Sequence, residues 1–225
     1  MNNNTRTKRE EDMSGRETAE RTVEIETRPE PIEVDLSRTA LVIVDMQNVF
    51  AGRTESADLF TKNAEAAMGA IIQTTKLADA ARAAAVTVIY LKMIKDPERK
   101  GKSIFKSPED AKIVDELSPL PGDVVVEKSC YSGFRGTGLE EFLKSRGISY
   151  LIFTGIATNI CVESTLRDAY FLNYWPILVS DATSNAGPSL TQEATVWNVE
   201  EAFGWVATTA NVLKVLSADR VKGVS

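Results

Sequence analysis

The sequence contains no histidine. This absence excludes Ser-His-Asp and Cys-His catalysis within the chain, and it excludes zinc sites of the H-E-x-x-H type. Acid–base chemistry near neutral pH must therefore use a carboxylate, lysine, cysteine or tyrosine whose pKa is shifted.

Cysteine and long apolar runs are also scarce. Two cysteines in 225 residues do not build a disulfide framework, and no apolar run approaches the roughly 20 residues that span a bilayer. The N-terminus lacks the basic-then-apolar pattern of a signal peptide. The net charge of −6 repels phosphate backbones, so nucleic-acid binding is not expected. We expect a cytoplasmic protein without membrane association.

Nucleotide-binding motifs are missing as well. There is no P-loop, and the fragment GTGLEE at 136–141 lacks the third glycine of a dinucleotide fingerprint and follows a loop. The sequence therefore predicts neither a nicotinamide cofactor nor any other cofactor, and it predicts no metal site.

Apolar residues make up 43% of the chain, which suffices for a real core. Residues 1–28 are polar and charged, so we expect a disordered or loosely docked tail followed by one domain over 29–225. In that domain, runs typical of buried strands alternate with helical patterns. The expected strands are 39–45, 86–92, 123–128, 149–155, 176–181 and a short one at 204–208.

The segments between these strands have helical spacing. We expect helices at 62–84, 109–117, 139–147, 160–173 and 189–203, and one at the C-terminus. Alternating strands and helices predict an α/β fold: a Rossmann-like three-layer α/β/α sandwich with a mostly parallel six-stranded sheet.

Ligands of such sheets bind beyond the carboxyl ends of the strands. Asp45 ends the first strand, Lys128 ends the third, and Cys161 follows the fourth. An acid, a base and a nucleophile thus reach one edge. Each also has a purely structural reading, as a turn-capping acid, a solvated lysine and a small buried hydrophobe. Glu127 could equally be the functional residue of the third strand.

Cys161 follows a strand-to-helix turn in which Thr158 or Asn159 is a good N-cap. A thiol in the first helical turn faces the positive end of the helix dipole, which predicts a lowered pKa. Lys128 beside it would favour the thiolate and stabilise an oxyanion. Cys130 could pair with Cys161 in a redox couple, but a reducing cytoplasm disfavours that alternative.

Three segments carry a resemblance to a known family: ALVIVDMQNVF, KSCYSGF and TGIATNICVESTLRDA. They resemble the isochorismatase-like cysteine hydrolases, and most closely the ureidoacrylate amidohydrolases. The resemblance covers roughly residues 28–210. It implies cleavage of a C–N bond in a small amide or ureide through a thioester. The alternatives are another carbamoyl or amide hydrolase of the family, and a catalytically inactive binding module.

The same resemblance implies roles for individual residues. Asp45 is the base, Lys128 its partner and Cys161 the nucleophile. A cis peptide between Ile156 and Ala157 would aim the backbone N–H groups of Ala157 and Cys161 at the oxyanion. The substrate would contact Asn48, Phe50 and Tyr131. Members of the family are usually homo-oligomers, so a dimer or tetramer is expected.

One segment departs from the ureidoacrylate enzymes. Residues 91–107 are shorter here and rich in lysine. These lysines either receive a carboxylate of the substrate or form a solvated loop.

Overall fold

A computed structural model describes residues 21–57, 63–96 and 103–222. Its centre is a six-stranded sheet in which every neighbouring pair is parallel, in the order β5-β4-β3-β6-β7-β8. The strands are β3 (Thr39–Val44), β4 (Thr87–Met93), β5 (Val124–Lys128), β6 (Tyr150–Ile156), β7 (Trp175–Ser184) and β8 (Trp205–Ala207). The predicted fold class is therefore confirmed, and all six predicted strands are present.

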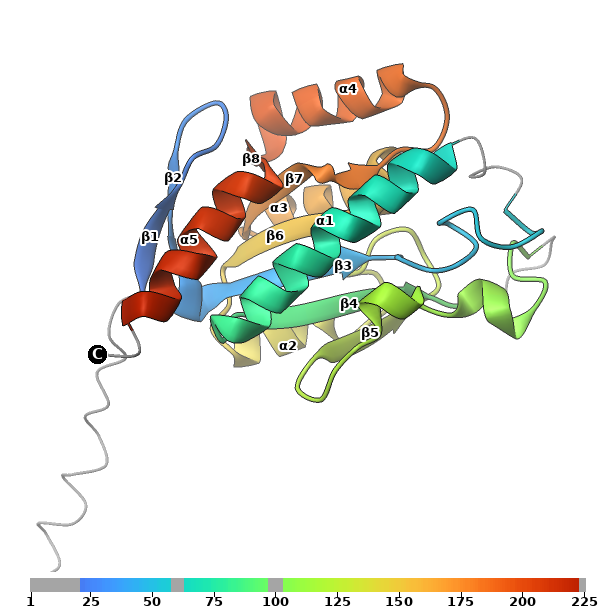
Figure 1. Cartoon of the computed structure of the whole chain (residues 1–225), viewed down its shortest axis with the longest axis horizontal. Coiled ribbons are helices and arrows are strands. Elements are labelled where there is room, and N and C mark those ends of the chain that lie inside the picture. The colour runs from blue at the N-terminus through green and yellow to red at the C-terminus, as the bar shows by residue number, and fades with distance from the viewer. Residues whose placement is uncertain (1–20, 58–62, 97–102, 223–225) are drawn as a thin grey trace, which may run out of the picture.

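Helices cover both faces of this sheet (Figure 1). The helices α1 (Ala64–Ala83) and α5 (Thr209–Lys222) pack on each other and on β7 across one face, while α2 (Leu139–Ser145) and α3 (Glu163–Phe171) lie behind the other. The helix α4 (Ser189–Asn198) follows β7. In α1 the buried residues recur every three or four positions and are mostly alanine, so this helix sits close to the sheet.

The strand order places the site. Counted within this sheet alone, it corresponds to 3-2-1-4-5-6, in which the chain reverses direction across the sheet between β3 and β6. Ligands of open α/β sheets bind at that switch point, beyond the carboxyl ends of the strands. In Figure 1 these ends lie to the right, where the loops that follow β3, β4 and β5 meet.

A glycine allows β3 and β6 to approach at this point. Gly155 has φ +132°, and a Cβ atom there would overlap the Val44 carbonyl oxygen of the neighbouring strand.

We expect Gly155→Ala to lower the free energy of unfolding by about 2–3 kcal/mol, through backbone strain and overpacking. Gly147→Ala is the matched control, because Gly147 also has a positive φ (+65°) but has open space around it. This control is expected to cost about 1 kcal/mol. Equal losses in urea unfolding of the two variants would contradict the close approach.

The N-terminal boundary of the folded part differs from the prediction. The strands β1 (Thr22–Ile25) and β2 (Ile32–Asp35) form an antiparallel hairpin, and Ile25 is completely buried. Arg28, whose bond to Pro29 is cis, pairs its backbone with Val206 at the outer edge of β8. Residues 22–28 therefore belong to the packed domain and not to a tail. The rest of the predicted tail, residues 1–20, lies outside the described residues.

Three predicted helices also differ. The segment 109–117 forms two separate 3₁₀ turns, Pro108–Ala111 and Asp115–Leu117, since Ile113 between them pairs with Gln47 in an extended conformation. The helix after β6 begins with a π turn at Thr158–Val162, and α4 continues into another at Val199–Phe203. A short 3₁₀ turn, Leu36–Arg38, leads into β3.

Candidate active site

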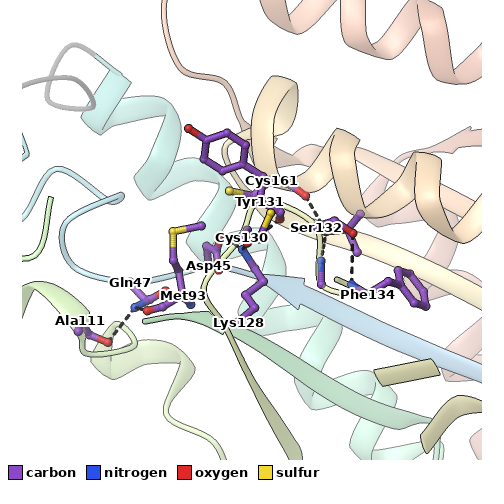
Figure 2. Close-up of polar contacts among 12 residues, drawn as sticks. Asp45, Gln47, Met93, Ala111, Lys128, Cys130, Tyr131, Ser132, Phe134 and Cys161 are labelled. Atoms are coloured by element: carbon purple, nitrogen blue, oxygen red, sulfur yellow. Dashed lines mark hydrogen bonds and ion pairs between the residues drawn. The ribbon is translucent and has the colours of Figure 1, made fainter. Parts of the chain in front are cut away.

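Asp45 immediately follows β3 and is completely buried. Its φ is +48°, in the left-handed region that few residues other than glycine adopt, and its backbone N–H donates to the Leu91 carbonyl. Such conformations cost energy and cluster at functional sites. The backbone turn directs the carboxylate to the sheet edge, where Figure 2 shows it between Lys128 and Cys161.

Lys128 ends β5 and is also buried, with its ammonium nitrogen 2.6 Å from Asp45 Oδ2. The same nitrogen donates to the carbonyl oxygens of Cys130 and Tyr131, each at 3.1 Å. An ammonium group has three N–H donors, and here each has an acceptor. Lys128 therefore binds both the Asp45 carboxylate and the loop that follows β5. With its three donors occupied, Lys128 favours the Cys161 thiolate through its charge. A role of Lys128 at the oxyanion stays a prediction.

Glu127, the alternative to Lys128, points away from the site. Its carboxylate is exposed and pairs with Lys92 at 3.1 Å. Successive residues of a strand face opposite sides, so only one of the two could enter the buried site. Lys92 is thus paired with a carboxylate. Residues 97–102 of the lysine-rich loop lie outside the described residues, so its role toward a substrate carboxylate stays a prediction.

Cys161 lies in the π turn that follows β6 and is 4% exposed. The peptide bond between Ile156 and Ala157 is cis. Neither predicted cap occupies the N-cap position, which is taken by Ala157. The Thr158 hydroxyl is buried without a hydrogen-bond partner among the described residues, whereas the amide of Asn159 exchanges two hydrogen bonds with the backbone of Ala186 (3.1 and 2.9 Å). Asn159 thus fastens the cysteine turn to the segment that follows β7.

The electrostatics of Cys161 differ from the prediction. Burial, followed by the negative charge of Asp45, raises the pKa of the Cys161 thiol, while Lys128 and a hydrogen bond with the Ala157 backbone lower it less. The predicted lowering by the helix terminus is therefore wrong. The pKa of Asp45 is raised by burial despite the opposing charge of Lys128. The resting site consequently holds a neutral thiol, which must lose its proton to a base before it can attack.

Asp45 is placed to be that base. Its Oδ2 accepts from Lys128, whereas its Oδ1 is buried without a hydrogen-bond partner among the described residues. Cys161 lies near enough for its interaction with the Asp45 carboxylate to shift the pKa of both groups. A raised pKa brings the carboxyl closer to neutral pH, which suits a group that first accepts and later returns a proton.

This arrangement predicts the pH dependence of kcat/KM. Asp45 must be ionised to accept a proton, so activity should fall as the pH drops through its pKa, which burial raises above the ordinary 3.8. Because the pKa of Cys161 is raised above the ordinary 9.0, its ionisation should produce no alkaline limb below that value. Initial rates measured from about pH 4 to pH 9 test both points. Exposed Asp115 supplies the control, since Asp115→Asn should leave the profile unchanged. An acid limb at or below 3.8 would contradict the assignment.

A small apolar cavity of about 110 Å³ opens above the cysteine. Its walls are formed by Phe50, Met93, Ile104, Tyr131, Ala157, Ile160 and Cys161. Phe50 and Tyr131 thus line the cavity, whereas Asn48 does not. Both hydrogen bonds that the Asn48 side-chain amide donates go to Glu109, one to its carbonyl and one to its carboxylate (3.2 and 2.9 Å).

Several residues of the site were not singled out from the sequence. Met93 is paired in register with Lys128. The predicted strand 86–92 stopped one residue short of Met93. A strand extended to 93 would have placed Met93 at the carboxyl end of the sheet, where ligands are expected to bind. Gln47 is completely buried and bonds to both backbone groups of Met93 and to the Ala111 carbonyl (Figure 2). A lone glutamine beside a buried strand was its only signal.

Among the residues that the structure describes, no group of three or more His, Cys, Asp or Glu side chains could hold a metal ion. Within the same residues, no helix is long and apolar enough to cross a membrane. Cys130 and Cys161 are both free thiols.

Comparisons with known proteins agree with the fold of this chain. Residues 39–211 match the isochorismatase domain. The chain is 44% identical to the ureidoacrylate amidohydrolase RutB of Agrobacterium fabrum over 84% of its length and 95% of that relative, and 42% identical to RutB of Rhizobium rhizogenes over 87% and 90%. Among solved structures, a cysteine hydrolase from Pseudomonas syringae pv. phaseolicola matches with a TM-score of 0.74 at 29% identity, covering 83% of this chain and 95% of that one.

The more distant N-carbamoylsarcosine amidase from Thermoplasma acidophilum aligns with a TM-score of 0.65 at 27% identity, over 76% of this chain and 96% of that one. The Rossmann-like sheet and the matches over most of the chain thus define the class of this protein as a hydrolase with an α/β fold that acts on C–N bonds. The chain belongs to the isochorismatase family.

Proposed function

We propose that this chain is a cysteine-dependent amidohydrolase that cleaves a C–N bond of a small ureide through a thioester intermediate. Family membership supports the coarser statement, hydrolysis of carbon–nitrogen bonds other than peptide bonds. The observation that carries the finer one is the buried trio: a thiol beside a carboxylate whose second oxygen is bound by an ammonium group, at the base of a small cavity.

In the proposed reaction, Asp45 Oδ1 accepts the thiol proton of Cys161 as the sulfur attacks the carbonyl carbon. Lys128 keeps the carboxylate oriented throughout. The backbone N–H groups of Ala157 and Cys161 donate to the oxyanion. Asp45 then protonates the departing nitrogen, and it later deprotonates the water that cleaves the thioester. The step requires no cofactor.

Ureidoacrylate is the first substrate to test. The names of the relatives support it, and a cavity of about 110 Å³ fits a small planar molecule. The cavity walls are apolar apart from Tyr131, so recognition of the ureido group falls to Tyr131 and the backbone.

Ammonia release from ureidoacrylate, its saturated analogue, its neutral amide and nicotinamide tests this assignment. Ureidoacrylate should give the largest kcat/KM, and intact mass spectrometry under rapid quench should show an acyl adduct on Cys161. A protein that binds these ureides without releasing ammonia would instead be an inactive binding module. Faster turnover of the neutral amide would show that a substrate carboxylate is not recognised.

The expected homo-oligomer, a dimer or tetramer, remains part of this proposal. Large apolar side chains exposed on the chain support it: Phe171 and Leu190 are each 68% exposed and Trp197 is 62% exposed. Sedimentation velocity measures the state directly, and a monomer at micromolar concentration would contradict it.

A further inference from the structure

Thr165 occupies a position that the mechanism above does not use. It lies in α3, one turn after the nucleophile, and is completely buried. Its hydroxyl donates to the Cys161 carbonyl at 2.7 Å and accepts from the backbone N–H of Gly133 at 3.0 Å. One hydroxyl therefore joins the cysteine turn to a segment that lies 32 residues from Thr165 in the chain.

That segment is the loop Cys130–Phe134, which we call the Tyr131 loop. Lys128 binds the loop at its first two carbonyl oxygens, and Tyr131 forms part of the cavity wall. At Gly133 the packing is tight: a Cβ atom there would overlap the Leu91 side chain and lie 3.2 Å from the methyl group of Thr165. The loop is thus bound at both ends by buried side chains of the site.

We propose that Thr165 is a positioning residue that fixes the Tyr131 loop relative to the Cys161 thiol. This inference rests on the proposed function. Lys128 ties the start of the loop to the base Asp45, and Thr165 ties its far end to the nucleophile. The position of the cavity wall is thereby fixed relative to Asp45 and Cys161. Small misplacements of reacting groups lower reaction rates steeply.

A competing explanation is that the hydroxyl serves α3 alone. Threonine commonly donates to the carbonyl four residues earlier in a helix, and this bond by itself has little effect on function. The bond from Gly133 is what separates the two explanations, because only positioning requires it. Valine has nearly the same shape as threonine but satisfies neither partner, whereas serine keeps the hydroxyl.

Kinetics of Thr165→Val and Thr165→Ser, with rates normalised to folded protein, provide the first test. For the valine variant we expect kcat/KM to fall by about 10-fold to 100-fold, with a lower kcat and a higher KM. The serine variant should restore both parameters to within about threefold of wild type. Thr74→Val is the matched control. Thr74 lies on α1 and is equally buried, and among the described residues its hydroxyl donates to the Ala182 carbonyl of β7, away from the site, so the kcat/KM of this variant should remain unchanged.

An unchanged KM in the valine variant, or a serine variant as impaired as the valine one, would overturn the proposal. Hydrogen exchange at the Gly133 amide, followed by NMR, is the second test and needs no substrate. We expect this amide to be protected in wild type and in Thr165→Ser, and to exchange faster in Thr165→Val. An unprotected amide in wild type refutes the proposal even if the valine variant does not fold. If wild type releases no ammonia from any ureide, the proposed function fails, while the exchange result still decides whether Thr165 binds the loop.

Discussion

Replacing Cys161 by alanine is expected to lower kcat by roughly 10⁴-fold or more while the fold persists. In the proposed mechanism the sulfur is the atom that forms the covalent intermediate, and no other thiol lies among the residues that line the described cavity. Removing one small, buried side chain should cost the fold little beyond a minor cavity. Ammonia release and the urea midpoint, measured on the same preparation, separate the chemical effect from a folding defect.

Cys130 provides the matched control for this variant. It is the only other cysteine of the chain, it is partly exposed, and only its backbone carbonyl contacts Lys128. Cys130→Ser should therefore keep kcat within about twofold of wild type, since no step of the mechanism uses its thiol. Loss of activity in both variants would favour the redox couple of Cys130 and Cys161 over hydrolysis. Full activity of Cys161→Ala would refute the proposal that Cys161 is the nucleophile.

Replacing Lys128 by methionine is expected to lower the free energy of unfolding by about 3–5 kcal/mol at pH 7 and to abolish turnover. The variant leaves the Asp45 carboxylate buried without its counter-charge, and it removes the donor for the Cys130 and Tyr131 carbonyls. Urea unfolding monitored by tryptophan fluorescence measures the loss.

The pH dependence of this loss follows from Asp45. Its pKa is raised by burial and held down by Lys128, so removing the lysine raises it further. A carboxyl whose pKa is higher in the folded than in the unfolded chain does not destabilise the fold while it is protonated in both states. The free energy of unfolding then falls as the pH rises through the pKa of the folded state. The defect of Lys128→Met should therefore shrink as the pH is lowered toward 3.8, the ordinary value.

Two further variants check this explanation. Asp45→Asn combined with Lys128→Met removes the stranded charge, so the double variant should be more stable at pH 7 than Lys128→Met alone. Lys92→Met breaks the exposed pair with Glu127 on the neighbouring strand and should cost at most about 1 kcal/mol. A pH-independent defect, or equal defects in the Lys92 and Lys128 variants, would show that the buried charge is not the cause.

The sequence predicted the sheet because buried parallel strands have a strong local signal. The TALVIV stretch is completely buried, and its apolar run leaves few alternatives. Because ligands of parallel sheets bind at the carboxyl ends of the strands, the sequence then predicted that Asp45, Lys128 and Cys161 lie together, without any contact information. Side-chain direction along β5 separates Lys128 from Glu127, but only once the facing layer is known.

What the sequence could not predict depends on neighbours distant in the chain. The pKa of Cys161 follows from burial and from Asp45, which outweigh the local helix terminus. The N-terminal hairpin was missed because polar residues alternate with Val23 and Ile25 in a strand of only four residues. Asn48 follows a motif of the family, yet its amide is bound by Glu109, which is 61 residues away. The Thr165 bond to Gly133 had no sequence signal at all.

The strand order also explains why the cation of the site stands on a long side chain. Neighbouring strands lie about 4.8 Å apart, and β4 separates β5 from β3, so the side chains of Lys128 and Asp45 must together span roughly 10 Å of sheet to meet. A long side chain on β5 covers most of that span with its methylene groups, and the Asp45 side chain covers the remainder. Asp45 and Cys161 come from adjacent strands and need no such length. Reach across the intervening strand, and not charge alone, therefore restricts the residue at position 128.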